Sequence, residues 1–234
     1  MALREVVLDT ETTGLSVASG HRIIEIGAVE LIDKVPTGKK FRSYLNPQRS
    51  ISDGAYRVHG ISAEFLQNKP LFADVADELA NFIGESHLVI HNAPFDMNFL
   101  NNEFLLVERK QIPFERAIDT LVIAKKLYPG CKVSLDALCK RFKIDLSHRS
   151  FHGALKDAEL LAMVYMEMVG REQTSLSLTE TRSLIIDKAV VFEAGSNILV
   201  RPSLKEEEAH EALIKSISNA LWIKLGGIKT RVGN

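Results

Sequence analysis

Features typical of secreted, membrane-spanning or disulfide-stabilised proteins are scarce in this sequence. The 234 residues include two cysteines, Cys131 and Cys139, and one tryptophan. No apolar run approaches the roughly 20 residues that span a bilayer, and the first residues enter a strand-like run without the apolar core of a signal peptide. We therefore expect a cytoplasmic protein that has no membrane partner and whose cysteines are reduced thiols in the core.

The chain also has no excess of charge of either sign. Its 29 Lys and Arg residues balance 30 Asp and Glu residues, for a net charge of −1. This balance argues against a broad basic surface, so any polynucleotide should bind locally, with metal ions supplying positive charge. A hydrophobic share of 46% and a charged share of 25% are those of an ordinary globular chain, which excludes a disordered or low-complexity protein.

The order of apolar patterns predicts an α/β fold, a mixed sheet flanked by helices. Three strands joined by short turns, one of them at 36–38, predict an antiparallel meander, and parallel strands follow. The connection over 46–70 shows no period and is expected to be an irregular loop. Strands are expected at about 5–8, 22–35, 40–45 and 88–90, and helices at 72–83, from 94 onward, and at 119–127, 134–142 and 154–169.

After Gly170 the sequence becomes polar and rich in Ser and Thr, which predicts a domain boundary near residue 172. The expected parts are a domain over 1–172, a linker over 173–181 and a C-terminal region over 182–234. Within the last part, residues 185–200 have strand character, and a helix is expected over 203–221 with Ser203 as its N-cap.

Asp9 and Glu11 are the first candidates for a functional site. They stand two residues apart at the end of a buried strand, so both side chains face the same side of the sheet. Taken alone, such a pair is more often a polar strand end than a site. Two carboxylates beside an apolar strand are costly to bury unless a cation joins them, which favours a metal site.

Three later residues can join this pair. Asp96 lies in the first turn of the helix that Pro94 opens, just beyond a strand whose end can lie beside the end of the first. We place His152 in the loop before the 154–169 helix and Asp157 in that helix, because five residues turn a helix by about 500°. A loop histidine can move as a general base, whereas a helical aspartate is fixed as a metal ligand.

The carboxylates together form an all-oxygen ligand set: Asp9, Glu11, Asp96 and Asp157. Hard oxygen ligands suit Mg²⁺ or Mn²⁺ better than Zn²⁺. Four negative charges in one pocket would repel one another strongly without metal. Two divalent cations about 3.5–4 Å apart would neutralise them and clamp a phosphodiester, so we expect two such ions here.

Three segments that carry these residues resemble the exonuclease motifs of the DEDD superfamily, in its histidine-containing branch. They run from Asp9 to Leu15, from His91 to Asp96 and from His152 to Ala158, and their order and spacing fit the family over about residues 4–170. The resemblance implies a ribonuclease-H-like fold and 3′→5′ exonuclease activity. Likeness to the proofreading exonucleases of bacterial DNA polymerase III lies in three further segments: 23–30, 58–61 and 134–139.

The resemblance also implies roles for individual residues. Asp9, Glu11 and Asp157 match metal ligands, Asp96 matches a fourth carboxylate that often acts through water, and His152 matches the general base. The resemblance also implies residues that contact the terminal nucleotide. Gly54 would contact it through its backbone, and Leu15 would make an apolar contact to the base. The implied nucleotide-binding residues are Asp9, Glu11, Thr12, Leu15, Gly54, His59 and Asp157.

The same resemblance implies partners for the rest of the chain. Gln173, Leu176 and Leu178 match a short motif that binds the sliding clamp, with Leu178 at a position where an aromatic residue is common. Residues 182–234 match the region that binds the polymerase III alpha subunit, and a small theta-like subunit can join the exonuclease domain. The implied substrate is a single-stranded or frayed DNA 3′ end, and the implied place is the replisome at the nucleoid.

The predicted reaction is hydrolysis of the 3′-terminal phosphodiester with release of a nucleoside 5′-monophosphate, His152 taking a proton from water. Two other functions stay open. An RNA 3′ exonuclease of the oligoribonuclease or tRNA-trimming type would use the same site, and cleavage rates on matched DNA and RNA strands would separate the two. A non-catalytic replisome tether would need none of these carboxylates, and failure to cleave any strand with Mn²⁺ present would favour it.

Overall fold

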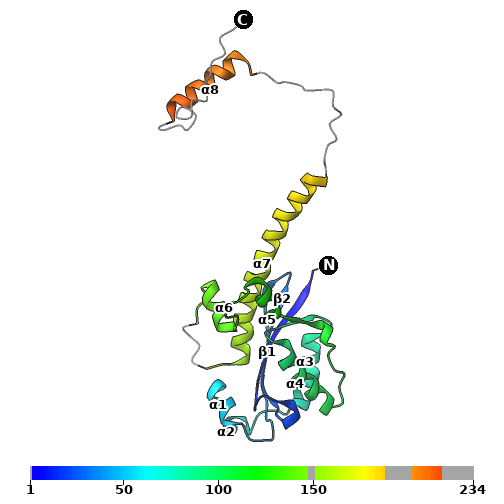
Figure 1. The fold of residues 1–234 in the computed structure, drawn as a ribbon. Helices are drawn as coiled ribbons and strands as arrows, with labels where there is room; N and C mark the ends of the chain where they lie inside the picture. Colours follow the sequence, from blue (N-terminus) through cyan, green and yellow to red (C-terminus); the bar gives the residue numbers. More distant parts are fainter. Residues whose placement is uncertain (1, 147–150, 188–201, 218–234) are drawn as a thin grey trace. The chain divides into compact units, whose positions relative to one another are not determined.

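Five strands form one mixed sheet (Figure 1). β1 (Arg4–Thr12) pairs antiparallel with β2 (Ile23–Ile32), and β2 pairs antiparallel with β3 (Val35–Tyr44). On its other side β1 pairs in parallel with β4 (His87–Ile90), which pairs in parallel with β5 (Ala117–Asp119). The order β3-β2-β1-β4-β5 confirms the predicted sheet of three antiparallel strands followed by parallel ones.

The computed structural model describes residues 2–146, 151–187 and 202–217, and of residues 171–187 and 215 it describes the backbone alone. None of the helices in this described part combines the length and apolar character that crossing a bilayer demands. The helices are η1 (Val17–Ser19), α1 (Asp53–His59), α2 (Ala63–Leu66), α3 (Phe72–Ile83), α4 (Ala93–Leu106), η2 (Phe114–Arg116), α5 (Thr120–Leu127), α6 (Leu135–Phe142), α7 (Ala154–Asp187) and α8 (Leu204–Ser216).

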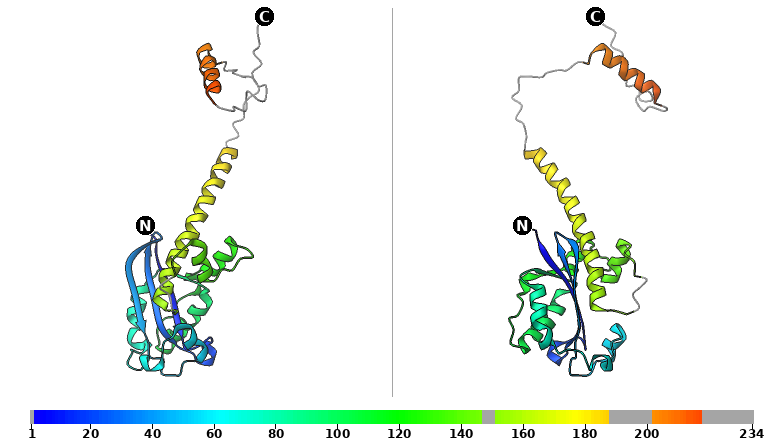
Figure 2. Two further views of the ribbon diagram at one scale, coloured as in Figure 1. Left: turned by 90° about the vertical axis from the view of Figure 1, so that its left-hand side faces the viewer. Right: turned by 180° about the vertical axis from the view of Figure 1, so that it is seen from behind.

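Alternate residues of β1 feed two apolar cores, one on each face of the sheet. Val6 and Leu8 pack with α3 and α4, whereas Val7 packs with α5, α6 and α7. Figure 2 shows α3 and α4 on one side of the strands and α7 on the other. All three β1 side chains are fully buried, and each stabilises the fold by about 1.5–3 kcal/mol relative to an exposed position.

The start of α7 lies directly against the sheet at Gly27. A Cβ at Gly27 would come within 2.2 Å of the Ala154 carbonyl carbon, so no larger residue fits. Gly27 is paired with Asp9 across β2 and β1. Because paired residues point to the same face of a sheet, α7 begins on the face that carries Asp9, and its first turn brings Asp157 there.

The turn between β2 and β3 lies at Asp33 and Lys34, not at 36–38 as predicted. Both residues have positive φ angles, 49° and 67°, which the favoured two-residue hairpin turn requires. Pro36 lies inside β3 instead. A proline is tolerated there because β3 is an edge strand, with one side free of ladder hydrogen bonds.

The segment over 46–70 contains two helices, α1 and α2, where we predicted an irregular loop. The side chains of Ser52 and Ser62 cap their N-termini by accepting from backbone N–H groups three residues later. The strand β5 was also not predicted. Both cysteines are free, but Cys131 is exposed and Cys139 buried, so the prediction of a core position holds for Cys139 and is wrong for Cys131.

The helix α7 continues to Asp187, well beyond its predicted end near Val169. The backbone of 173–181, predicted to be a linker, is therefore helical, since Ser and Thr lower helix propensity only slightly. Contacts divide the chain into the units Met1–Arg182 and Ser183–Asn234. The predicted boundary near residue 172 stays a prediction.

In the second unit, α8 begins after the predicted N-cap Ser203. Glu206 accepts from the backbone N–H of Ser203, which completes a capping box. The predicted strand over 185–200 lies almost wholly outside the described residues, and its first residues belong to α7. The end of the predicted 203–221 helix also lies outside them.

Candidate active site

Buried acidic side chains gather where β1 ends and α7 begins. Glu11 is 9% exposed and Asp157 is 4% exposed. One ligand atom from each of Glu11, Asp157 and His152 lies within 4.8 Å of the others, a grouping that could hold a metal ion. The structure therefore brings together three of the five side chains that the sequence assigned to metal binding and proton transfer.

His152 lies in the loop immediately before α7, as the sequence predicted. Its Nδ1 is 3.1 Å from Asp157 Oδ2, and its backbone N–H donates to the Val58 carbonyl at 3.3 Å, which ties the loop to α1. An ionised carboxylate only accepts hydrogen bonds, so Nδ1 carries the hydrogen when Asp157 is ionised. In the neutral ring Nε2 then keeps a lone pair, and since the side chain is 45% exposed, water can reach the ring.

Asp96 lies outside this three-residue grouping. Its Oδ1 accepts hydrogen bonds from the Thr10 backbone N–H at 3.0 Å and from the Thr10 hydroxyl at 2.6 Å. Burial raises the pKa of Asp96 to about 7, although the bonds from Thr10 oppose the shift. The sequence placed Asp96 near Asp9, and the structure fixes it against Thr10, the residue between Asp9 and Glu11.

Asp9 shares a face of β1 with Glu11, two residues further on. It is half-buried and lies opposite Gly27, beside the start of α7. It does not belong to the grouping of Glu11, His152 and Asp157, so its role as a metal ligand stays a prediction.

The electrostatics of the site favour a bound cation. Burial raises the pKa of Glu11 to about 8, with a further contribution from the neighbouring charge of Asp157. His152 opposes this shift only in part. A carboxyl group with such a pKa resists ionisation until a cation balances its charge, so the donor set fits a divalent metal with oxygen ligands.

A hollow of about 380 Å³ adjoins these carboxylates, and we call it the terminal pocket. Five of the predicted nucleotide-binding residues line it: Glu11, Thr12, Leu15, Gly54 and His59. Phe95 and Val58 also line it, although the sequence motifs predicted a role for neither. The sequence could have indicated Phe95, because it directly precedes Asp96 in the second motif and lies in the same first turn of α4.

The terminal pocket offers an apolar wall and a polar one. Leu15 is 86% exposed, and a side chain at Gly54 would meet no atom within 4 Å, so both positions are open to a ligand. His59 is buried, and its Nδ1 accepts from the Ile61 N–H at 2.9 Å. Burial lowers the pKa of His59, which keeps the ring neutral at physiological pH.

The residues predicted to bind the sliding clamp lie in the C-terminal half of α7. Gln173, Leu176 and Leu178 belong to α7, but their side chains lie outside the described residues.

Comparison with known proteins agrees with this geometry. A family model described as an exonuclease matches residues 6–165. The DNA polymerase III subunit epsilon of Rickettsia felis is 49% identical over 92% of this chain and 97% of its own length. The subunit of that name from Escherichia coli is 43% identical over 94% of this chain and 97% of its own.

The chain belongs to the family of DNA polymerase III epsilon subunits. It is a metal-dependent 3′→5′ proofreading exonuclease that works on DNA with the polymerase. Membership of the epsilon family thus accounts for the buried acidic side chains, Glu11 and Asp157, that lie beside the terminal pocket.

Solved structures support the same fold. Exonuclease X in complex with 5′ overhanging duplex DNA superposes with a TM-score of 0.56 at 28% identity, over 71% of this chain and 92% of that one. The nuclease domain of 3′hExo, a DEDDh family member bound to rAMP, gives a TM-score of 0.60 at 19% identity, over 73% of this chain and 93% of that one. The second likeness bears on the fold alone.

Proposed function

We propose that Asp9, Glu11, Asp96 and Asp157 hold two divalent cations, Mg²⁺ or Mn²⁺, and that His152 is the general base. The observation that carries this proposal is the grouping of Glu11, His152 and Asp157 within 4.8 Å. Bound there, divalent ions supply an activated water and stabilise charge on the phosphodiester and the departing 3′ oxygen. The product is a nucleoside 5′-monophosphate.

The protein's own residues orient the reaction. Asp157 holds the imidazole of His152 through Nδ1, which leaves Nε2 to take the proton from the attacking water. The terminal pocket receives the last nucleotide, with Leu15 and Phe95 against the base. Neither side chain reads base edges, so we expect no base preference.

A frayed 3′ end suits such a pocket. The terminal nucleotide must leave the duplex to enter, and a mismatched pair lowers the cost of unpairing. This difference favours removal of misincorporated nucleotides over correct ones.

The proposed protein partners bind both the C-terminal part of the chain and the exonuclease domain. Residues 182–234 bind the polymerase alpha subunit, and Gln173, Leu176 and Leu178 bind the sliding clamp. A theta-like subunit joins the exonuclease domain, and the complex works in the cytoplasm at the nucleoid. Pull-down of the full-length and 1–172 chains against polymerase and clamp tests this assignment, which fails if truncation leaves polymerase binding intact.

Two variants test the catalytic assignment. Asp9→Ala should nearly abolish cleavage of a labelled single strand with Mn²⁺, and most activity left intact would contradict the metal assignment. His152→Ala should lower kcat by about 100-fold or more while Mn²⁺ binding changes little. An equal loss of kcat and of Mn²⁺ binding would mean that His152 has a structural role. Glu159→Gln, a carboxylate change on the same helix at the Lys40 ion pair, is the matched control.

A further inference from the structure

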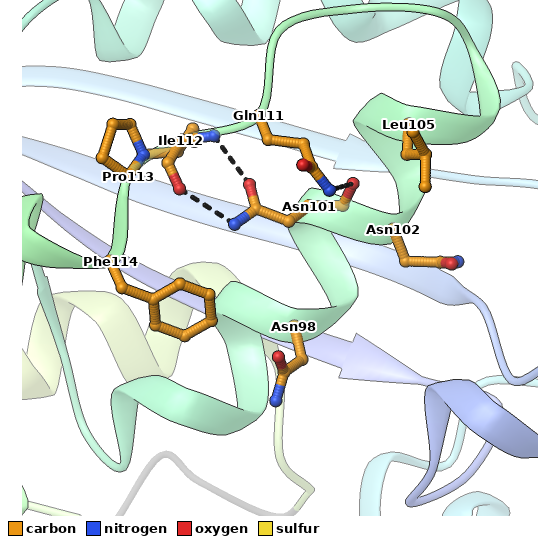
Figure 3. Close-up of a pocket in the computed structure, with 8 residues that line it drawn as sticks. All are labelled: Asn98, Asn101, Asn102, Leu105, Gln111, Ile112, Pro113 and Phe114. Carbon is orange, nitrogen blue, oxygen red and sulfur yellow. Dashed lines mark hydrogen bonds between the residues drawn. The ribbon is translucent and has the colours of Figure 1, made fainter.

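The terminal pocket continues along the exposed side of α4. Leu15 and Phe95, on its wall, also line a second hollow of about 480 Å³ that reaches Asn98. Asn98 in turn lines a third hollow of about 410 Å³, shown in Figure 3. Because each hollow shares a lining residue with the next, the three form one series, which we call the α4 track.

In the third hollow, hydrogen bonds hold the loop beside α4 in place, and two amide side chains have no partner among the described residues. The buried Asn101 exchanges two hydrogen bonds with the backbone of Ile112, at 2.9 and 2.7 Å, which anchors the loop beside α4. Figure 3 shows Asn98 and Asn102 on successive turns of α4, with the ring of Phe114 beside the same helix. Neither amide side chain is engaged by another described residue, and Phe114 is 48% exposed.

The exposed side of α4 carries no charge. The helix contains two acidic residues, Asp96 and Glu103, which are 3% and 1% exposed. Arg22 neutralises Glu103 through two hydrogen bonds, at 2.7 and 2.5 Å. An uncharged face is unusual in a chain whose charged share is 25%, and it leaves no exposed carboxylate on α4 to repel a polyanion.

We propose that the α4 track binds the single strand upstream of the terminal nucleotide, with the third and fourth nucleotides over Asn98, Asn102 and Phe114. The proposal rests on the proposed function, because the terminal pocket must hold the 3′ end. From Phe95 to Leu105 the helix advances about 15 Å, and stacked nucleotides follow one another at about 3.4 Å, so the track spans roughly four nucleotides. Amides can bond phosphates or base edges, and a ring stacks on any base.

The track is tested by the length dependence of cleavage. The full-length protein with Mn²⁺ is given oligothymidylates of two to eight nucleotides, and the p-nitrophenyl ester of thymidine 5′-monophosphate as a probe that reaches only the terminal pocket. The KM of the wild type should fall about ten-fold between two and five nucleotides and then level off. Asn98→Asp with Asn102→Asp should raise the ratio of octamer KM to ester KM about ten-fold, and Phe114→Ala should raise it as well.

Asn68→Asp is the matched control, because Asn68 is exposed and lines none of the three hollows. It makes the same Asn→Asp change at one position, half the change of charge of the double variant, and should leave the ratio at the wild-type value. A flat length dependence, or an unchanged ratio in the double variant, overturns the track and leaves the proposed function standing. A loss that is equal on ester and octamer also overturns it. A wild type that cleaves neither probe overturns the proposed function itself.

Discussion

Buried carboxylates occur in two settings in this molecule. Glu30 and Glu103 are almost fully buried and each pairs with an arginine, Arg4 at 2.6 Å and Arg22 at 2.5 Å. Glu11 and Asp96 are also buried, but in the part of the chain that the structure describes no Lys or Arg forms an ion pair with either.

The pKa values follow this division. The hydrogen bond from Arg4 lowers the pKa of Glu30, whereas burial raises that of Glu11 to about 8 and that of Asp96 to about 7. Glu30 and Glu103 come with their own cationic partner, whereas Glu11 and Asp96 form no ion pair with a Lys or Arg of the described residues. In the proposed function a divalent ion balances these two carboxylates, whose burial lowers the stability of the metal-free protein.

The largest effect is expected for activity at Glu11. Glu11→Gln removes a carboxylate charge that the proposed metal balances, so kcat should fall about 1000-fold or more. Single-turnover cleavage of a labelled oligonucleotide at saturating Mn²⁺ measures it. A fall of less than ten-fold would place Glu11 with the structural carboxylates.

The next largest effect is expected for folding stability, at a buried carboxylate that pairs with an arginine. Glu103→Gln leaves the partly buried Arg22 without a charged partner, so the free energy of unfolding should fall by roughly 3 kcal/mol. Urea denaturation of the two proteins gives the difference. The control is Asp77→Asn, which breaks the exposed pair with Arg109 and should leave the midpoint almost unchanged. Equal effects at both pairs would remove the distinction between buried and exposed partners.

The smallest expected effect is a gain in stability, opposite in sign to the loss expected for Glu103→Gln. The pKa of Glu11 in the folded, metal-free protein is about 8, above the ordinary value of 4.5. The stability that depends on a protonated Glu11 is therefore fully present below pH 4.5 and is lost as the pH rises through 8. Metal-free Glu11→Gln should therefore be more stable than the wild type at pH 8, by about 1–3 kcal/mol, and should show little gain at pH 5. Thermal unfolding in chelator at the two pH values checks this. A variant destabilised at pH 8 would mean that Glu11 is already compensated by protein groups.

Much of this arrangement follows from local sequence. Period-two patterns place Asp9 and Glu11 on one face of β1, and the proline-led helix start places Asp96 in the first turn of α4. The division between a loop His152 and a helical Asp157 also follows from their spacing, and the structure bears it out.

Contacts between distant segments could not be predicted in this way. The hydrogen bonds that hold Asp96 against Thr10 depend on the distance between β1 and α4, which no local pattern encodes. Positive φ angles at Asp33 and Lys34 moved the hairpin turn away from the more obvious Pro36. Two short helices, α1 and α2, were missed because they are too short to show a helical period, although serine N-caps mark their starts.

The most direct measurement of the central claim is a calorimetric titration of the metal-free protein with Mn²⁺ at pH 7, in two buffers of different ionisation enthalpy. Glu11 and Asp96 have pKa values of about 8 and about 7, so both are at least partly protonated before metal arrives. The account predicts that Mn²⁺ binding releases about one proton or more, and that Glu11→Gln lowers the release. Binding without proton release, or no binding of Mn²⁺, would contradict the claim that a divalent ion balances these carboxylates.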